Sequence, residues 1–279
     1  MNAKRGVVTL TLVTMLWGTT FPAIKVIMKL LDATSYAGYR SMIAALAMLP
    51  LIGKKAFEND RVLKGGIILG LLYFTGLALQ AWGIKYTTAS SAAFITSFNV
   101  PLVCLLEVLI LRRRPSRELL ISMMMAVLGV LLLSLEPGSY RLSYGDIIVL
   151  ACTIFWALQV IFIDRYSREC SVIPLAFMQL MISGVVGIAL SASLGEPVRL
   201  DFSSWILLAY LAVVCSSLTC VLQIYGQRYT TSTQAAIIYT LEPVFASAFS
   251  SILLGEILTA RQYAGAMLIV VATYMASKA

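Results

Sequence analysis

Charged side chains inside or at the edge of the long apolar stretches of this 279-residue sequence include four candidates for a functional site: Lys25, Arg40, Glu107 and Glu242. A charge in the middle of a membrane helix costs at least about 2.5–3.5 kcal/mol, so such residues usually face a protein interior or a cavity. We interpret Lys25 and Glu242 as candidate binding groups for a zwitterionic substrate, and Arg40 and Glu107 as candidates for coupling or gating. The alternatives are internal ion pairs that only fix helix packing and, for Arg40, snorkelling to the membrane surface.

Further candidates are uncharged polar and aromatic side chains within the same apolar stretches. A small-molecule site combines apolar walls with a few directed polar groups. The residues that provide such groups are Trp17, Gln80, Ser97, Asn99, Trp156, Gln159, Gln223 and Tyr239. Alternatively, the tryptophans are anchors at the membrane interface, and the polar residues make interhelical hydrogen bonds, each worth about 0.6 kcal/mol.

Three prolines, Pro22, Pro101 and Pro243, also fall within apolar stretches. A proline inside a helix removes one backbone hydrogen bond and bends the helix. The freed carbonyl is tolerated in a membrane only where protein, water or substrate reaches it. Because Pro101 and Pro243 follow related sequence segments, we predict paired bending elements near the site and group both with the gating candidates. Simple curvature for packing is the alternative.

The sequence lacks the residues that disulfide, metal, nucleotide and catalytic sites usually need. The five cysteines include no C-x-x-C pair and histidine is absent, which disfavours a disulfide framework and a zinc site. Any proton coupling must therefore use carboxylates. No Walker A loop, H-E-x-x-H or G-x-S-x-G motif is present, so we expect no metal, no cofactor, no direct use of ATP and no enzyme activity.

The composition indicates which elements must hold these residues. Sixty per cent of the residues are hydrophobic and 12% are charged, and the mean hydropathy is +0.90, whereas a soluble domain of this length needs far more charge. Apolar runs of roughly 17–25 residues, enough to cross about 30 Å of hydrocarbon, recur along the chain. We predict an all-α integral membrane protein with ten transmembrane helices, at 7–31, 36–52, 64–84, 88–111, 117–135, 143–164, 172–194, 203–226, 231–254 and 259–277.

The basic residues predict the orientation of these helices. An even number of spans places both termini on one side, and a cytoplasmic N-terminus puts fourteen basic residues inside and four outside. That bias indicates an N-in, C-in topology by the positive-inside rule. Because the basic residues flank apolar helices, we attribute the net charge of +8 to topology and anionic lipid headgroups rather than to nucleic acid.

Two segments of the chain repeat one pattern. Residues 80–88 and 223–231 both read Q-x-aromatic-G-x-basic-Y-T-T, and an Ala-Ala pair and a proline follow each. The repeat unit holds five predicted helices, an odd number, so the second half, 139–279, enters the membrane upside down relative to the first, 1–138. Such inverted halves favour a transporter that works by alternating access.

Several segments resemble one family of membrane proteins. They are L-W-G-x-x-F-P-A-x-K at 16–25, Arg40, Y-T-T-A-S-S-A-A at 86–93, and L-E-P-V-F-A at 241–246 followed by L-G-E at 254–256. Together they resemble the drug/metabolite transporter superfamily, specifically its EamA-type branch, over essentially the whole chain. The resemblance implies metabolite transport, often export of amino acids or related compounds. The first half has three arginines, 112–114, in place of L-G-E, so any gating role of that acidic residue falls on Glu256 alone.

These features predict a secondary transporter or facilitator in the cytoplasmic (inner) membrane that moves small organic metabolites, mainly outward, by alternating access. A lipid or lipid-linked sugar flippase is the alternative. An intramembrane enzyme lacks the usual general base, and a purely structural subunit needs no inverted halves. The expected partners are a small-molecule substrate and membrane lipid, without nucleic acid. Small residues such as Gly66-x-x-x-Gly70 permit close helix packing, either within a monomer or in a homodimer.

Overall fold

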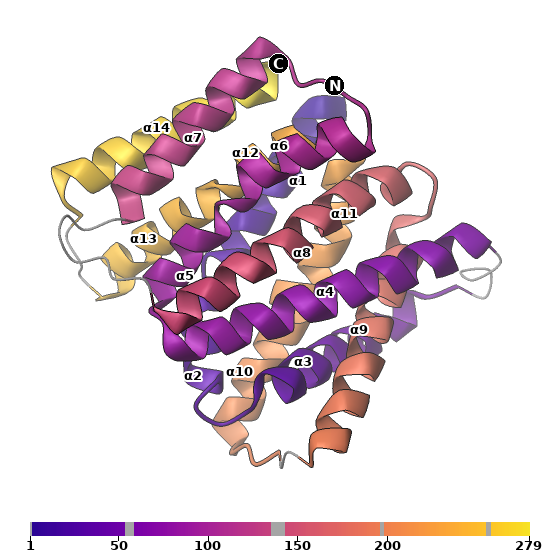
Figure 1. Cartoon of the computed structure of the whole chain (residues 1–279). Coiled ribbons are helices and arrows are strands. Elements are labelled where there is room, and N and C mark those ends of the chain that lie inside the picture. The colour runs from indigo at the N-terminus through magenta and orange to yellow at the C-terminus, as the bar shows by residue number, and fades with distance from the viewer. Residues whose placement is uncertain (1, 54–58, 135–142, 196–197, 255–257) are drawn as a thin grey trace.

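The computed structural model describes residues 2–53, 59–134, 143–195, 198–254 and 258–279, and this part of the chain is almost entirely helical, without a strand (Figure 1). The helices pack as one bundle in which α4 and α8 cross the centre. In chain order the elements are α1 (Asn2–Trp17), α2 (Thr20–Ile27), α3 (Ala33–Met48), the 3-10 helix η1 (Leu49–Leu51), α4 (Asp60–Tyr86), α5 (Ala89–Thr96), α6 (Asn99–Ile110), α7 (Arg117–Ser134), α8 (Tyr144–Ser167), α9 (Val172–Leu194), α10 (Phe202–Ala212), the π-helix η2 (Val213–Leu218), α11 (Thr219–Gln227), α12 (Ser232–Tyr239), α13 (Leu241–Leu254) and α14 (Ala260–Lys278).

Seven helical stretches of the described chain are long and apolar enough to cross a membrane: Lys4–Ile27, Asp60–Tyr86, Ser91–Ile110, Arg117–Ser134, Tyr144–Ser167, Val172–Leu194 and Phe202–Gln227. The protein is therefore all-helical and multi-pass. The remaining predicted spans, 36–52, 231–254 and 259–277, contain α3, the pair α12–α13, and α14. The total of ten spans stays a prediction.

Three of the predicted helices are broken rather than merely bent, and each break comes just before a proline. The helices predicted at 7–31, 88–111 and 231–254 break at Gly18–Thr19, Ser97–Phe98 and Thr240. In every case the proline is the third residue of the helix that follows. A proline cannot donate to the carbonyl four residues earlier and its ring clashes with it. In the first turn of a new helix, however, that missing N–H has no intrahelical partner to lose.

Helices α3 and α9 belong to different halves of the chain and pack as an antiparallel pair. Ser35 hydrogen-bonds Ser191 at 2.5 Å, and Ser41 hydrogen-bonds Ser183 at 2.8 Å. As the residue number rises along α3 it falls along α9, so the helices run in opposite directions. Small residues let the two backbones approach closely, which is how helices associate inside a membrane.

Glycines mark the closest approaches between helices. A Cβ at Gly38 would lie 2.6 Å from the carbonyl carbon of Gly187, across the α3–α9 pair. A Cβ at Gly129 of α7 would lie 2.8 Å from the carbonyl oxygen of Gly265 of α14. Neither position tolerates a larger side chain without moving backbone, so both helix pairs depend on glycine.

The predicted small-residue motif of α4 packs within the chain. A Cβ at Gly66 would lie 2.3 Å from the Cβ of Met178, and one at Gly70 would lie 2.6 Å from the Cβ of Ile182, both on α9. The motif therefore serves intramolecular packing, and a homodimer stays a prediction without support from these residues.

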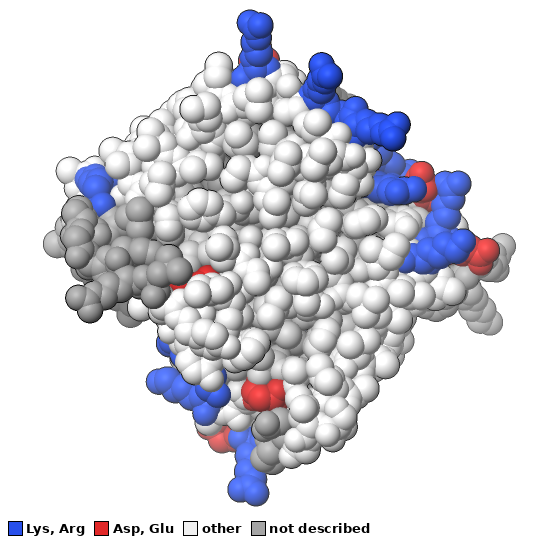
Figure 2. Space-filling model, in the orientation of Figure 1, with Lys and Arg blue, Asp and Glu red and all other residues white. Residues whose placement is uncertain are grey.

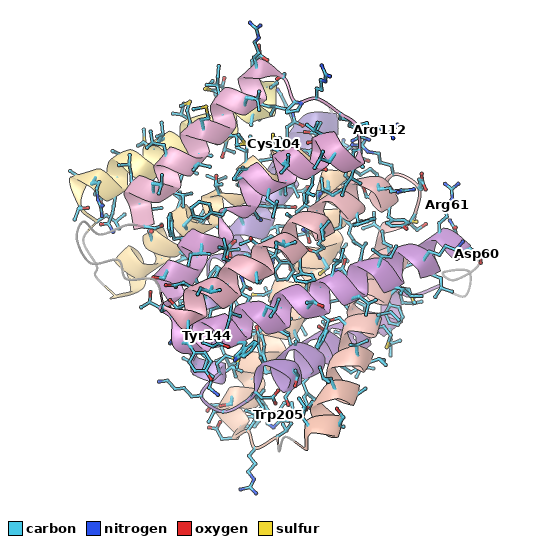
Figure 3. All side chains as sticks on the ribbon, viewed as in Figure 1. Asp60, Arg61, Cys104, Arg112, Tyr144 and Trp205 are labelled. Carbon is cyan, nitrogen blue, oxygen red and sulfur yellow. The ribbon has the colours of Figure 1, made fainter. Side chains whose placement is uncertain are left out.

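The surface has the character of a membrane protein. A broad white face separates the blue side chains along the upper right edge from a sparser group at the lower left (Figure 2). Asp60, Arg61 and Arg112 lie at the first end, and Tyr144 and Trp205 lie at the other (Figure 3). The long axis of α4, from Asp60 to Tyr86, connects these two ends.

Candidate functional site

A cavity opens between helices of both halves, and we call it the main cavity. Its volume is about 80 Å³, which is enough for several water molecules. Its lining residues are Trp17, Thr20, Arg40, Tyr73, Leu77, Gln80, Thr96, Asn99, Trp156, Gln159, Val160, Gln223, Tyr239 and Glu242.

Each broken helix contributes one lining residue from either side of its break. These pairs are Trp17 and Thr20, Thr96 and Asn99, and Tyr239 and Glu242. Breaks leave backbone groups without helical partners, and in a membrane such groups are tolerated next to a cavity or other protein. The three prolines therefore direct the chain to end and restart its helices around the main cavity.

Arg40 reaches the main cavity from α3 and is held from behind by η2. Its Nε donates to the Leu211 carbonyl at 3.2 Å and to Ser216 Oγ at 2.7 Å, and Nη2 donates to the Cys215 carbonyl at 2.9 Å. Nη1 donates to the Tyr36 hydroxyl. A π-helix withdraws carbonyls from the ordinary i to i+4 pattern, which leaves them able to accept from the guanidinium. Arg40 is 3% exposed, so the alternative in which it snorkels to the membrane surface does not fit the structure.

Glu242 lies in the first turn of α13 and lines the main cavity. Within the described residues its carboxylate makes no ion pair and no side-chain hydrogen bond. Arg40 lines the same cavity and forms no ion pair with it either. Arg40 and Glu242 therefore line one cavity without forming an ion pair with each other, which differs from the predicted alternative of simple internal pairing.

Three polar atoms of the main cavity are buried without a hydrogen-bond partner among the described residues: Trp156 Nε1, Gln159 Nε2 and Gln223 Oε1. Gln159 is 2% exposed and Gln223 is 1% exposed. Buried polar groups are almost always hydrogen-bonded, to protein or to ordered water. The three residues that carry these atoms all line the main cavity.

Trp17 and Trp156 both line the main cavity, each against a tyrosine. The ring centroids of Trp17 and Tyr239 lie 5.3 Å apart, and those of Tyr73 and Trp156 lie 5.6 Å apart. Such aromatic pairs prefer tilted or edge-to-face geometry. The interpretation of these tryptophans as interface anchors does not fit their position.

Two predicted cavity residues lie elsewhere. Lys25 Nζ donates to the carbonyls of Ile84 at 2.6 Å and Thr87 at 2.5 Å, where it satisfies the end of α4. A cation suits a helix C-terminus because unpaired carbonyls gather there. Ser97 Oγ donates to the Ala93 carbonyl at 3.1 Å and lines a smaller apolar pocket. The sequence placed both in apolar stretches but did not show which way they face.

Glu107, predicted as a coupling or gating residue, does not line the main cavity. It is 3% exposed, and its Oε2 accepts from the backbone N–H of Thr233 at 2.8 Å and from Thr233 Oγ1 at 2.5 Å. A carboxylate is favourable at the start of a helix because the N–H groups there lack helical partners. Glu107 of α6 therefore fixes the N-terminus of α12.

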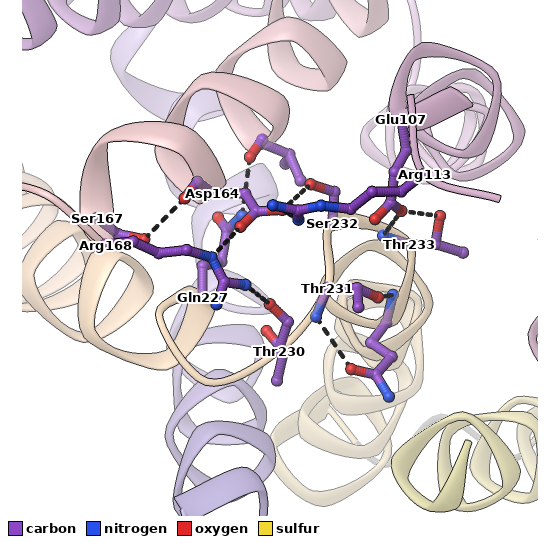
Figure 4. A network of polar contacts seen from close by, with 12 residues as sticks. Glu107, Arg113, Asp164, Ser167, Arg168, Gln227, Thr230, Thr231, Ser232 and Thr233 are labelled. Carbon is purple, nitrogen blue, oxygen red and sulfur yellow. Dashed lines mark hydrogen bonds and ion pairs between the residues drawn. The ribbon is translucent and has the colours of Figure 1, made fainter. Parts of the chain in front are cut away.

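Beside this contact lies a polar network that the sequence did not reveal (Figure 4). Asp164 of α8 is fully buried, and it pairs with Arg113 at 2.6 Å and with Arg168 at 2.7 Å. Ser232 Oγ donates to the same carboxylate at 3.1 Å, and Arg168 Nη2 donates to the Thr230 carbonyl at 3.0 Å. The network ties together the ends of α6, α8 and α11 and the beginning of α12.

A short chain of hydrogen bonds connects this end of the bundle with the main cavity. The Tyr239 hydroxyl donates to Gln227 Oε1 at 3.1 Å, and Gln227 Nε2 donates to the Val160 carbonyl at 2.9 Å. Tyr239 and Val160 both line the cavity. Gln227, the last residue of α11, therefore bridges two residues of the cavity wall.

Of the predicted binding residues, the structure brings eight together around the main cavity: Trp17, Gln80, Asn99, Trp156, Gln159, Gln223, Tyr239 and Glu242. Helical spacing could have found Tyr73, which lies seven positions from Gln80 on the same helix, α4. Thr20 and Thr96 lie across the helix breaks from Trp17 and Asn99, so helical spacing does not predict them. The gating candidate Glu256 lies outside the described residues.

Comparisons with known proteins place both halves of the chain in the same family. Residues 4–135 and 143–278 each match the EamA-like transporter family. A relative called "Uncharacterized transporter" in Archaeoglobus fulgidus is 32% identical over 96% of this chain and 84% of its own length. A relative called "Probable amino-acid metabolite efflux pump" in Salmonella typhimurium is 27% identical over 99% of this chain and 95% of its own length.

One solved structure, described only as a protein crystal structure, has a similar fold. It superposes with a TM-score of 0.80 at 16% identity, covering 99% of this chain and 97% of that one. At this identity the likeness shows the fold alone.

Proposed function

The chain belongs to the EamA-like transporter family, and we propose that it is a secondary transporter or facilitator that moves amino acids or related small metabolites outward across the cytoplasmic membrane. The observation that carries the substrate class is the main cavity, because Arg40 and Glu242 line it without pairing. The name of the Salmonella typhimurium relative agrees with this class of substrate.

The two charges suit a zwitterion. A guanidinium has five N–H donors, and the bonds of Arg40 to described residues use Nε–H and one N–H on each Nη. Two donors therefore remain for a carboxylate, which binds arginine well because the geometries match. Glu242 offers acceptors to an ammonium group. A zwitterion satisfies both charges at once, whereas a singly charged solute leaves one unpaired.

We further propose that residues 1–138 and 139–279 are inverted five-helix halves that alternate access around this cavity, with both termini in the cytoplasm. Repeat-related contacts support this arrangement. A Cβ at Gly6 would meet the Gly226 carbonyl oxygen at 2.9 Å, and a Cβ at Gly145 would meet the Gly83 carbonyl oxygen at 2.5 Å. Gly83 and Gly226 hold the same position in the repeated segments. Each half therefore packs its first helix against the end of the other half's third.

The antiparallel pairs α3–α9 and α7–α14 agree with the same relation. In the repeat, α9 is the counterpart of α3 and α14 is the counterpart of α7. Pairing of an element with its own counterpart, in opposite directions, is what a pseudo-twofold axis in the membrane plane produces. The polar network around Asp164 then lies at the cytoplasmic end of the bundle.

Flux through reconstituted protein tests this function. Proteoliposomes loaded with labelled amino acids, sugars or nucleosides should release amino acids fastest, and repeating the measurement with and without a pH gradient tests coupling. Glu242→Gln should lower amino-acid flux by about tenfold or more, since a charge-assisted hydrogen bond to a buried group is worth about 1.5–3 kcal/mol.

Glu118→Gln is the matched control, because Glu118 lies exposed at the start of α7. It should transport like the unmodified protein. Equal rates for Glu242→Gln and Glu118→Gln in well-folded protein would refute the role of the cavity carboxylate. An absence of flux for every amino acid in the panel would refute the proposed substrate class.

A further inference from the structure

The unpartnered polar atoms of the main cavity are concentrated on the second half of the chain. Gln159 and Trp156 come from α8, and Gln223 comes from α11. Gln159 and Gln223 are almost fully buried, at 2% and 1% exposed. A buried polar atom without a partner is unfavourable, so the site is completed by a molecule that supplies the missing bonds.

Two uncharged polar residues of the opposite wall, Thr96 and Tyr73, are already engaged. Thr96 Oγ1 donates to the Ala92 carbonyl at 2.7 Å and accepts from Gln80 Nε2 at 3.4 Å. Tyr73 donates to Ser216 Oγ at 3.0 Å. The two glutamines differ from Thr96 and Tyr73, since one buried amide atom of each lacks a hydrogen-bond partner among the described residues.

A side-chain amide both donates and accepts hydrogen bonds, and this restricts what can satisfy two of them together. A carboxylate only accepts, an ammonium group only donates, and an apolar group does neither. A hydroxyl group and an uncharged carboxamide do both, but only the carboxamide has the planar geometry that is complementary to another amide. The indole N–H of Trp156 adds one more donor, which a carbonyl oxygen can accept.

We propose that Gln159 and Gln223, together with Trp156, form a specificity subsite that recognises an uncharged carboxamide group on the transported solute. This inference rests on the proposed function, in which Arg40 and Glu242 bind the charged groups of a zwitterion. The cavity then selects an amino acid with an amide side chain over one with an acidic or apolar side chain of the same size.

Three probes of similar size test the subsite: glutamine, glutamate and norleucine. Binding is measured with the purified full chain through its shift in thermal unfolding, and flux is measured in proteoliposomes. Unmodified protein should bind glutamine about tenfold or more tightly than either analogue, because the analogues leave buried polar groups unpaired.

Methionine is close to glutamine in length and lacks the amide, so Gln159→Met and Gln223→Met remove the recognition with little change of volume. Each should lose most of the preference for glutamine while norleucine binding stays the same or improves. Retained norleucine binding also shows that the variant is folded.

Gln179→Met is the matched control. Gln179 is a fully buried glutamine on α9 whose Oε1 also lacks a partner, but it does not line the main cavity, and its Nε2 contacts Cys220 Sγ at 3.3 Å. This variant should keep the preference for glutamine.

The outcomes distinguish a failure of the carboxamide subsite from a failure of the proposed transport function. If amino acids are transported but glutamine is not preferred, or if Gln159→Met and Gln223→Met keep the preference, the subsite is wrong and water alone serves these atoms, while the transport function stands. If none of the three amino acids binds or moves, the proposed function itself fails.

Discussion

At the scale of single residues, two acidic side chains have different surroundings. Asp164 is surrounded by two arginines and a serine hydroxyl, whereas Glu242 has no such partner among the described residues. A buried charge that is fully paired stabilises a particular arrangement of helices. One left unpaired beside a cavity is available to a ligand. Sequence alone cannot distinguish these cases, since both are single acids in apolar stretches.

Asp164→Asn is expected to weaken the bundle at its network end. The substitution keeps the shape of the side chain but removes the charge that holds Arg113 and Arg168, so the free energy of unfolding should fall by about 1–3 kcal/mol. Both arginines are nearly half exposed, at 45% and 42%, which keeps the loss below that of a fully buried pair. Thermal unfolding in detergent measures it.

The exposed pair between Arg61 and Glu169, at 63% and 43% exposed, provides the control. Glu169→Gln should change the free energy of unfolding by no more than about 1 kcal/mol, because water screens exposed ion pairs. Equal destabilisation by Asp164→Asn and Glu169→Gln would contradict a special role for the network.

At the scale of helices, the main cavity lies where three helices are broken before a proline. Pro22, Pro101 and Pro243 each occupy the third position of a helix that begins after a break. The helices on the two sides of each break present polar or aromatic side chains to the same space. Breaks of this kind are also hinges, since the backbone there lacks the continuous ladder that stiffens a helix.

Pro243→Ala should let α12 and α13 join, because alanine restores the N–H that can donate to the Tyr239 carbonyl. We expect transport to fall several-fold while the protein stays folded, since residues on both sides of the break line the cavity. Flux and thermal unfolding are measured on the same preparation.

Pro174 offers a control for this substitution, as it is also the third residue of its helix, α9, but follows a loop rather than another helix. Pro174→Ala should leave transport unchanged. A loss of transport in Pro174→Ala, or none in Pro243→Ala, would show that the break itself is not important.

At the scale of the whole molecule, the family match confirms the resemblance to EamA-type transporters that the sequence motifs carried. The proposed inversion of the halves predicts opposite locations for equivalent loops. In a background without the five native cysteines, a cysteine at Arg114 should react with an impermeant reagent only from the cytoplasmic side. A cysteine at Arg261 should react only from the other side.

Labelling in intact cells and in inverted vesicles makes this measurement. The exposed Arg61, which lies at the same end of the molecule as Arg112 in Figure 3, provides a further position that should behave like Arg114. If Arg114 and Arg261 react from the same side, the two halves are not inverted, and alternating access loses its mechanical basis.

The sequence by itself determined the class of this protein and much of its site. Its long apolar runs require helices in a membrane, because hydrocarbon offers no partner to an unpaired backbone, and its motifs indicated the family. Eight predicted binding residues line one cavity, since polar side chains in apolar helices turn toward the protein interior.

Only the tertiary structure decided how these residues are used. It directed Lys25 to the end of α4 and Ser97 to a smaller pocket. It also placed Arg40 against the Cys215 carbonyl of a π-helix that no residue pattern predicts. It also joined Asp164 to Arg113, 51 residues away in the chain. The direction in which a side chain points, and the distant residues that it contacts, depend on how the helices rotate and cross when they pack. That packing is set by all the helices together and cannot be inferred from the sequence of any one of them.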